Sequence, residues 1–500
     1  VHAAQFLNAR DLSTSSVYVS AIHHRHPTMA YLAEDYERIR WLRDAHALAI
    51  PADGPALYLF PQSASVPPEL ISRWEAALIA APLDPLGNVD FHVYHFDHSD
   101  VVEQPDFQHA YANFGNVAEL NGFRVIAARS GHHVLAELQL RVLNSPDHGD
   151  YRLVADLVDA WGHPWAQSFN DSYPSEQWSV GDTIIARMEI PLPTGIPPGE
   201  YRLAATLYSP STRHNLPALD IGGRAAAAAL LGPVQLERAA DMGTLPTPEQ
   251  RASAQFGDLQ LLGYDLPLRT LRPGGTLPVT LYWLTTDAPS EDYTISLRLG
   301  ETTLESAAPV HGSYPTGIWE AGEVVIDRHS PRLTRSAPAG GNALQVSVSV
   351  AEQELGNFLL GEINVERIER QWETPAVQHP TDLVLGETFR LIGYNLTPGE
   401  PLTLQLQWQS IDVSDTDYTV FVHALNSQGV LSAQSDSEPM NGNYPTSLWM
   451  QSEFIADSHT LTLPPGEYSL SLGMYLATTG ERLLLRDGND AVHIPAVIVP

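Results

Sequence analysis

The chain of 500 residues contains no cysteine and no lysine, so all 27 basic side chains are arginines. The absence of cysteine excludes disulfides, thiolate metal sites and cysteine nucleophiles. Acidic residues number 59, which gives a net charge of −32. A surface of this sign repels nucleic acid and anionic lipid, so we expect no nucleic-acid partner.

Long apolar runs and familiar catalytic motifs are also missing. The longest apolar run, residues 225–231, falls far short of the ~20 residues that a membrane helix needs. We find no Gly-x-Ser-x-Gly, P-loop, dinucleotide fingerprint or His-Glu-x-x-His, which counts against a self-contained enzyme of the commoner classes. No signal peptide is recognisable and the chain begins at Val1, which we interpret as a processed product or an excised fragment.

Residues 1–105 predict a small α/β domain, because short β-rich runs alternate with helical patterns. The expected strands are residues 17–22, 47–50, 56–60 and 91–96. A helix is expected over residues 28–42, where Met29, Leu32, Tyr36 and Ile39 recur at helical spacing. A second helix is expected over residues 68–81.

From about residue 110 the chain predicts three tandem antiparallel β-sandwiches of the immunoglobulin-like or jelly-roll-like kind. The expected domains are residues 110–240, 255–368 and 382–500, with linkers near 244–254 and 369–381. Each copy repeats three landmarks, a Gly-aromatic pair (122, 263 and 393), an Asp-Tyr pair (150, 292 and 417) and a Tyr-Pro hexapeptide. The first and third copies also share Pro-Pro-Gly-Glu-Tyr at 197–201 and 464–468, where the middle copy is degenerate.

An alanine run at residues 225–229 looks helical by propensity. Its counterpart in the third copy, residues 491–499, reads as a closing strand. We therefore expect a strand for the alanine run as well.

The hexapeptides read YPSEQW, YPTGIW and YPTSLW, at spacings of 141 and then 130 residues. In one interpretation, proline fixes a corner while tyrosine and tryptophan close one end of each sandwich. In the other, the rings form a platform on which sugars stack. We favour the structural corner, and the candidate ligand-binding residues are Tyr173, Trp178, Tyr314, Trp319, Tyr444 and Trp449. Trp283 and Trp408 occupy matching strand positions, where the first copy has Arg141.

An acidic residue follows each hexapeptide by four positions, and two copies carry another acid four further on. Such carboxylates could line a Ca²⁺ site with backbone carbonyls, or serve glycoside hydrolysis as pairs. The alternative that we favour is a solvated acidic edge that discourages strand-to-strand aggregation. No cofactor other than Ca²⁺ is expected. The candidate metal ligands are Asp182, Glu323, Asp327, Glu453 and Asp457.

Two smaller patterns have a structural and a functional interpretation. The cluster His23-His24-Arg-His26 could hold a transition metal, but a strand-to-helix turn is favoured because no close carboxylate completes the set. Residues 487–490, Asp-Gly-Asn-Asp, resemble part of a calcium-binding loop but lack the full EF-hand spacing, which favours a plain turn.

Taken together, VYVSAIHHRHPTMAYLAEDYERIRWL, ALYLFP, YPTSLW and PPGEY resemble one family over nearly the whole chain. It is the C-terminal extracytoplasmic region of bacterial membrane glycosyltransferases of the dolichol-phosphate-mannose mannosyltransferase-like (GT-C) kind, of the Chloroflexota type. In that family a multi-helix membrane domain carries catalysis, so the resemblance transfers no catalytic residue to this chain. It implies a cell-surface appendage, tethered through a membrane domain of the same polypeptide, that positions a glycan or glycosylated acceptor.

Three functional hypotheses follow. The first is this non-catalytic outer portion of a membrane glycosyltransferase. The second is a free-standing carbohydrate-binding cell-surface protein whose aromatic corners act together. The third is a structural surface or stalk protein. The resemblance favours the first.

Overall fold

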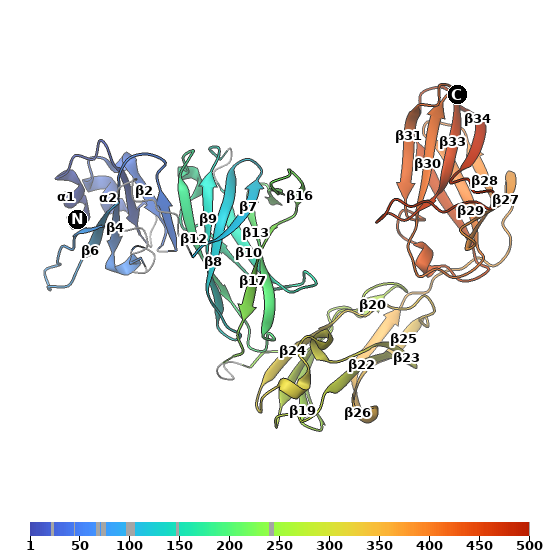
Figure 1. Ribbon diagram of the computed structural model, residues 1–500, viewed down its shortest axis with the longest axis horizontal. Helices are drawn as coiled ribbons and strands as arrows, with labels where there is room; N and C mark the ends of the chain where they lie inside the picture. Colours follow the sequence, from blue (N-terminus) through green and yellow to red (C-terminus); the bar gives the residue numbers. More distant parts are fainter. Residues whose placement is uncertain are drawn as a thin grey trace.

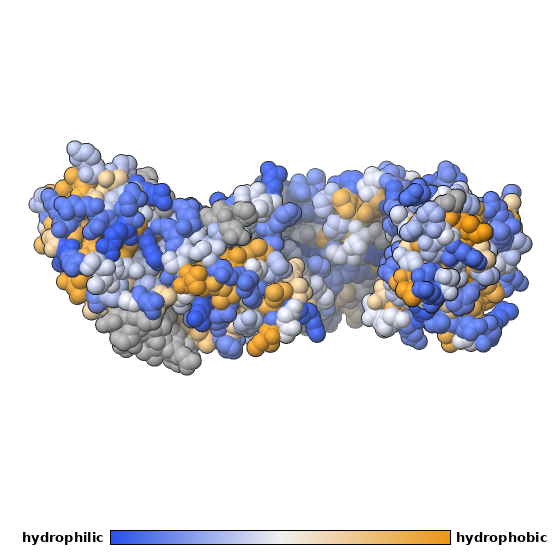
Figure 2. All heavy atoms as spheres, turned by 90° about the horizontal axis from the view of Figure 1, so that it is seen from above, coloured by the Kyte–Doolittle hydropathy of each residue, from blue (hydrophilic) through white to orange (hydrophobic). Residues whose placement is uncertain are grey.

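The structure is a computed structural model that describes residues 1–21, 25–44, 46–66, 71, 77–96, 106–146, 150–239 and 245–499. It is mainly β, with a small α/β domain followed by three antiparallel β-sandwiches, which confirms the predicted fold class. The four units follow one another along a bent path, with the second sandwich at the bend between the first and the third (Figure 1). The view at right angles shows small groups of apolar side chains on that face (Figure 2). Within the described residues, no helix combines the length and apolar character needed to span a bilayer.

The α/β domain is built on one mixed sheet of order β2-β1-β4-β6-β5. Strands β1, β2 and β4 run parallel, and β6 and β5 continue the sheet antiparallel. Two short helices, α1 (His2–Asn8) and α2 (Pro27–Leu32), accompany it. The strands are β1 (Ser16–Ser20), β2 (Ile39–Leu42), β4 (Ala56–Pro61), β5 (Ala77–Ala80) and β6 (Phe91–Phe96), with a 3-10 turn at Gln62–Ala64.

The helix predicted over residues 28–42 is wrong beyond Leu32. A 3-10 turn (Tyr36–Arg38) leads directly into β2, whose Ile39 and Trp41 are buried beside β1. The helical spacing therefore arose by chance from apolar residues of three different elements, α2, the 3-10 turn and β2. The helix predicted over residues 68–81 is also wrong at its end, because residues 77–80 form β5. Residues 67–70 and 72–76 lie outside the described residues.

Strand β3 (Ala47–Ile50) leaves the α/β domain, to which the sequence assigned it, and joins the first sandwich. It pairs antiparallel with residues 183–186 of β12. All four of its residues are buried, since both its faces are covered. Its uninterrupted apolar sequence is the pattern expected of such a strand.

The three sandwiches repeat one arrangement of eight strands. The first sheet has the order β7-β8-β9-β12, β18-β19-β21-β24 and β27-β28-β29-β32, and the facing sheet the order β11-β10-β13-β17, β23-β22-β25-β26 and β31-β30-β33-β34. The first sandwich comprises β7 (Gln108–Phe114), β8 (Ala118–Ala128), β9 (His133–Val142), β10 (Arg152–Val158), β11 (Pro164–Asn170), β12 (Thr183–Pro191), β13 (Gly199–Ser209), β14 (His214–Asn215), β15 (Ala218–Leu219), β16 (Ala225–Ala226) and β17 (Ala229–Leu236). The second comprises β18 (Gln250–Phe256), β19 (Leu259–Asp265), β20 (Thr270–Leu271), β21 (Val279–Thr285), β22 (Tyr293–Leu299), β23 (Thr302–Ala307), a 3-10 turn (Pro309–Gly312), β24 (Val324–His329), β25 (Gly340–Val350) and β26 (Gln353–Val365). The third comprises β27 (His379–Leu385), β28 (Phe389–Thr397), β29 (Leu402–Ser410), β30 (Thr419–Asn426), β31 (Leu431–Ser437), β32 (Phe454–Leu461), β33 (Gly466–Tyr475) and β34 (Val492–Val499).

The repeated glycine of the Gly-aromatic pair follows a β-bulge in every copy. The pairing of the second and third strands shifts register between Leu120 and Gly122, and likewise just before Gly263 and Gly393. A side chain at Gly263 would approach a carbonyl oxygen of the neighbouring strand within 2.4 Å, and one at Gly393 within 2.6 Å. At these two positions the backbones come too close for a Cβ atom, whereas the nearest atom to a Cβ at Gly122 would lie at 3.3 Å.

The Pro-Pro-Gly-Glu-Tyr segments form tyrosine corners. The hydroxyl of Tyr201 donates to the carbonyl of Pro197 at 2.8 Å, and Tyr468 donates to Pro464 at 3.0 Å. In the middle copy Asn342 donates from Nδ2 to the carbonyl of Pro338 at 2.7 Å, so an amide replaces the missing tyrosine in the same contact.

Other local predictions met mixed outcomes. The alanine run is confirmed as strand at β16 and the start of β17, and residues 492–499 form the closing strand β34. The two linkers are shorter than predicted, because residues 250–254 belong to β18 and residues 379–381 to β27. Asp487 accepts the backbone N–H of Asn489, the geometry of the plain turn that was favoured. His23 and His24 lie outside the described residues.

Buried residues show how the first two units join. On β1, Val17 and Val19 pack under the helices of the α/β domain, while Tyr18 packs in the core of the first sandwich. The α/β sheet is therefore covered on one face by its helices and on the other by the first sandwich. The second and third sandwiches each have a core of their own.

Candidate junction sites

Each Tyr-Pro hexapeptide folds into the same corner. One 3-10 turn follows the proline, at Ser175–Gln177, Thr316–Ile318 and Thr446–Leu448. The tryptophan Nε1–H then returns to the carbonyl of the tyrosine. These distances are 3.1 Å for Trp178 to Tyr173, 3.0 Å for Trp319 to Tyr314 and 3.0 Å for Trp449 to Tyr444.

The serine or threonine after the proline links the corner to the facing sheet. Its hydroxyl accepts the backbone N–H of the tyrosine in the repeated Asp-Tyr pair. The bonds are Tyr151 to Ser175 at 2.8 Å, Tyr293 to Thr316 at 2.8 Å and Tyr418 to Thr446 at 2.9 Å. Two of the repeated sequence landmarks, the hexapeptide and the Asp-Tyr pair, are therefore joined by the same hydrogen bond in every copy.

The aromatic rings of the corners are buried, with exposures from 0% for Trp449 to 8% for Trp178 and Tyr444. Each set of rings belongs to the core of its own sandwich. A sugar ring stacks on an exposed aromatic face, which none of the six residues presents. We therefore abandon Tyr173, Trp178, Tyr314, Trp319, Tyr444 and Trp449 as ligand-binding residues and keep the structural interpretation.

The acidic residue four positions after each tryptophan turns inward rather than toward solvent. Asp182 and Glu453 are each 1% exposed, so the favoured solvated edge is wrong for them. In each copy the carboxylate accepts the backbone N–H of the residue after the tryptophan. The bonds are Ser179 to Asp182 at 3.0 Å, Glu320 to Glu323 at 2.8 Å and Met450 to Glu453 at 2.9 Å.

An arginine from the preceding unit completes the third corner. Arg370, five residues past β26, donates from Nη1 to Glu453 Oε2 at 2.7 Å, to the Tyr444 hydroxyl at 2.6 Å and to the carbonyl of Leu448 at 3.0 Å. Tyr444 in turn donates to Glu453 Oε1 at 2.7 Å. Burial and the neighbouring carboxylate raise the pKa of Tyr444, which stays a phenol and a donor.

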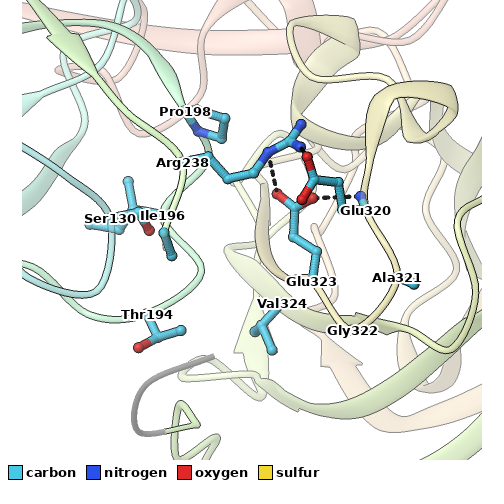
Figure 3. A pocket seen from close by; sticks show the side chains of 11 residues that line it. Ser130, Thr194, Ile196, Pro198, Arg238, Glu320, Ala321, Gly322, Glu323 and Val324 are labelled. Atoms are coloured by element: carbon cyan, nitrogen blue, oxygen red, sulfur yellow. Dashed lines mark hydrogen bonds and ion pairs between the residues drawn. The ribbon is translucent and has the colours of Figure 1, made fainter. Parts of the chain in front are cut away.

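The second corner receives Arg238 in the same way, two residues past β17. Its guanidinium lies between the carboxylates of Glu320 and Glu323 (Figure 3). Arg238 donates from Nε to the hydroxyl of Tyr314 at 3.0 Å and from Nη2 to the carbonyl of Ile318 at 2.8 Å. The Tyr314 hydroxyl donates to Glu323 at 2.6 Å.

The first corner uses an arginine from within the α/β sheet. Arg40 of β2 donates to Asp182 Oδ2 at 3.0 Å and to the hydroxyl of Ser179 at 3.0 Å. Burial raises the pKa of Asp182, against the effect of Arg40, which acts to lower it. The aspartate is shorter than glutamate, and here Tyr173 donates to the carbonyl of Gln177 instead.

We call this arrangement, an arginine of one unit bound to the buried acid of the next hexapeptide corner, the arginine latch. It consists of Arg40 with Asp182, Arg238 with Glu323, and Arg370 with Glu453. Asp182, Glu323 and Glu453 were predicted as metal ligands, and in this structure each is paired with an arginine guanidinium. Over the described residues, no three histidine, aspartate or glutamate side chains are grouped to hold a metal ion.

The remaining two candidate metal ligands are also buried and paired. Asp327 accepts the N–H of Val310 at 2.7 Å and faces Nε2 of His329 at 2.8 Å. Asp457 accepts the N–H of Met440 at 2.8 Å and faces Nε2 of His459 at 2.9 Å. Through these bonds, both aspartates hold a corner loop against the sheet.

The sequence alignment that places Arg141 at the position of Trp283 and Trp408 is one residue out of register, because Leu140 is the structural equivalent of these tryptophans. Leu140 pairs with Leu120 and Ile184, as Trp283 pairs with the equivalent residues of its copy. Arg141 faces the other side of the sheet because side chains alternate along a strand.

The latches were missed because each joins residues far apart in sequence, for example Arg370 and Glu453, 83 positions apart. A signal was present, however. In a chain with 27 arginines against 59 acids, an arginine just past a closing strand is a natural partner for an acid repeated in every copy.

Further contacts flank the junction between the first and second sandwiches. Arg328 lies 3.8 Å from the ring centre of Trp165 and donates to the carbonyl of Pro164 at 2.8 Å. Ile326 donates its backbone N–H to Gly195 at 2.7 Å. The cavity beside Arg238 measures only about 120 Å³ (Figure 3). That volume is below the range of small-molecule sites, so the junction is a packed contact.

Comparisons with known proteins assign no family to the chain. No family model matches it, and no curated protein matches it. Two solved alpha-2-macroglobulins, a mutant from Salmonella and the native conformation from E. coli, each share 12% identity with it at a TM-score of 0.14. The alignments cover 81% and 91% of this chain but only 25% and 28% of those proteins. A likeness this weak carries no argument about function.

Proposed function

We propose that the chain is a non-catalytic structural spacer that holds its units at fixed orientations outside the cell membrane. The observation that carries this proposal is the arginine latch, because an arginine is paired with the corner acid of the next unit at all three junctions. Domains joined by flexible linkers would not be expected to have an arginine–acid pair at each junction, because such a pair fixes the orientation of the two units.

The energetics support a firm junction. Arg370 is 15% exposed and Glu453 only 1%, so water screens their interaction weakly. Removing one partner of a buried pair typically costs about 3–5 kcal/mol, because the other charge is left buried and unpaired. Opening the junction while the third sandwich stays folded would carry a penalty of the same kind.

The test measures the distance between the first and third sandwiches. Because the chain has no cysteine, Glu200→Cys and Glu467→Cys, exposed positions in equivalent strands, can carry two spin labels without background. We expect a narrow distance distribution in the parent and a distribution at least twice as wide in the variant Arg238→Ala with Arg370→Ala.

The matched control is Arg251→Ala, because the exposed Arg251 has no side-chain partner in the described part of the chain. It should leave the distribution narrow. A distribution that is already broad in the parent, or that stays narrow without both latch arginines, would show that the latches do not set the geometry. Circular dichroism of each variant verifies that the sandwiches remain folded.

We further propose, from the sequence resemblance, that this spacer belongs to a membrane glycosyltransferase and presents a glycan or glycosylated acceptor. The free-standing carbohydrate-binding alternative requires exposed aromatic corners, and the six corner rings are buried. The reading frame upstream of Val1 distinguishes a membrane glycosyltransferase from a free-standing cell-surface protein. Several apolar spans of ~20 residues are expected for the glycosyltransferase, whereas a lone signal peptide would reject it.

A further inference from the structure

The third sandwich contains a serine, a histidine and an aspartate in hydrogen-bond contact, apart from the latches. Ser435 lies on β31, whereas His459 and Asp457 lie on β32. The Oγ of Ser435 is 3.1 Å from Nδ1 of His459, and Nε2 of His459 is 2.9 Å from Oδ2 of Asp457. A hydroxyl within reach of a base that a third group orients is the arrangement that activates a serine as a nucleophile.

The topology of the sandwich explains why these side chains meet. Strands β31 and β32 are the edges of the two facing sheets, and they lie in contact at one side of the sandwich. Ser435 pairs with Val422 and His459 with Leu404, both fully buried core residues, so both polar side chains also point between the sheets. Asp457 and His459 are buried, but Ser435 is partly exposed at the edge, where a small molecule can approach it from solvent.

The aspartate determines which nitrogen of the histidine acts as the base. A carboxylate only accepts hydrogen bonds, so Nε2 carries the proton and Nδ1 keeps a lone pair for the hydroxyl of Ser435. Asp457 is itself held in place because its Oδ1 accepts the backbone N–H of Met440 at 2.8 Å. Compared with the serine-protease triad the two nitrogens are exchanged, but each performs the same role in proton transfer.

The other two sandwiches show that the fold does not require this set. In the first copy the positions four and six residues after the corner acid are Ala186 and Met188, which are buried and apolar. The second copy has Asp327 and His329, but Glu305 faces the histidine where the third copy has its serine. Burying polar side chains costs free energy that the first copy avoids. The complete set therefore occurs once among the copies, as a reactive site does.

We propose that Ser435 is a reactive serine that takes up the acyl group of a small ester. Its Oγ attacks the carbonyl carbon while its proton passes to Nδ1 of His459. The bond between the carbonyl carbon and the ester oxygen then breaks, and that proton leaves with the departing alkoxide as an alcohol. One acylated serine and one alcohol result, so no further reactant is needed. The inference goes beyond the spacer function, because it concerns a single transfer to the protein and involves no latch residue.

The test treats the full chain with p-nitrophenyl acetate and locates the acetyl groups by peptide mass spectrometry over time. Ser432 is the internal reference, because it is an exposed serine of the same strand whose hydroxyl donates to the carbonyl of Val430. A positioned general base accelerates such a step by about 10²–10⁴-fold. Ser435 should therefore be acetylated at least about a hundredfold faster than Ser432.

Two variants and a control test the role of the histidine. Ser435→Ala should remove the rapidly acetylated site, and the control Ser432→Ala should leave it unchanged. Asp457→Asn keeps the shape of the side chain, but its amide donates to Nε2 and places the imidazole proton on Nδ1, so acetylation of Ser435 should slow about a hundredfold. Circular dichroism verifies that each variant is folded.

Acetylation of Ser435 no faster than that of Ser432 would overturn the proposal, as would an unchanged rate in folded Asp457→Asn. If Asp457→Asn does not fold, the comparison of the two serines in the parent chain decides alone.

Discussion

At the scale of single residues, the second sandwich contains a chain of charges that reaches from its core to a junction. His329 lies between Asp327 at 2.8 Å and Glu305 at 3.1 Å, so both ring nitrogens face carboxylates. Glu305 also faces His311 at 3.4 Å, whose ring lies 5.1 Å from that of Trp161 in the first sandwich. A histidine with two acceptors needs both protons and is therefore a cation.

This chain predicts how stability depends on pH. Burial acts to lower the pKa of His329, but Asp327 and Glu305 raise it from 6.5 to about 10. Burial acts to raise the pKa of Glu305, but the two histidines lower it from 4.5 to about 2. The histidine stabilises fully below pH 6.5 and loses its effect toward pH 10, whereas the glutamate stabilises above pH 4.5 and loses its effect toward pH 2.

The second sandwich should therefore be most stable between about pH 4.5 and 6.5 and weaken on either side. Calorimetric unfolding across this range measures the effect. Glu305→Gln should flatten the acidic limb and lower the stability maximum. The third sandwich has Ser435 facing the equivalent His459, so it serves as an internal comparison. A second sandwich with no stability maximum would contradict the assignment.

At the scale of elements, the bulge glycine gives a graded prediction. A Cβ atom at Gly263 would lie 2.3 Å from Pro248 and 2.4 Å from the carbonyl of Gln250, whereas one at Gly122 would meet nothing closer than 3.3 Å. Gly263→Ala should therefore cost about 1–3 kcal/mol of unfolding free energy, as overpacking usually does. Gly122→Ala should cost clearly less. Urea unfolding of the two variants compares them, and equal losses would show that backbone approach does not explain the glycine.

Helices and strands could be predicted from the sequence where all the apolar residues of a pattern belong to a single element. Runs such as residues 47–50 and 56–60 are buried strands and read as such. The helix predicted over residues 28–42 was wrong because apolar residues of three successive elements happened to recur at helical spacing. The destination of β3 in another domain's sheet left no local trace at all.

The site was less predictable than the fold. The repeated acids were found, but a repeated acid alone does not distinguish a calcium ligand from an arginine partner. That distinction depends on Arg238 and Arg370, which only the folded chain brings to the corners.

At the scale of the whole molecule, the latches predict indifference to divalent cations. A net charge of −32 alone suggests a protein whose acidic surfaces are held together by Ca²⁺. The buried acids of the corners are already matched by arginines, however. The melting temperature should be the same in EDTA and in millimolar calcium, within the error of the measurement. A rise with calcium that Glu453→Gln abolishes would restore the metal interpretation.

The exchange of β3 has a consequence for how the protein is made. During synthesis, residues 47–50 leave the ribosome long before their partner in β12, residues 183–186. The α/β domain must therefore emerge with an unpaired apolar strand, which is a site for aggregation until the first sandwich is complete. A truncation after the α/β domain would leave that strand permanently unpaired. The two units are thus a single unit of expression, and chaperone demand should peak while the first sandwich is being translated.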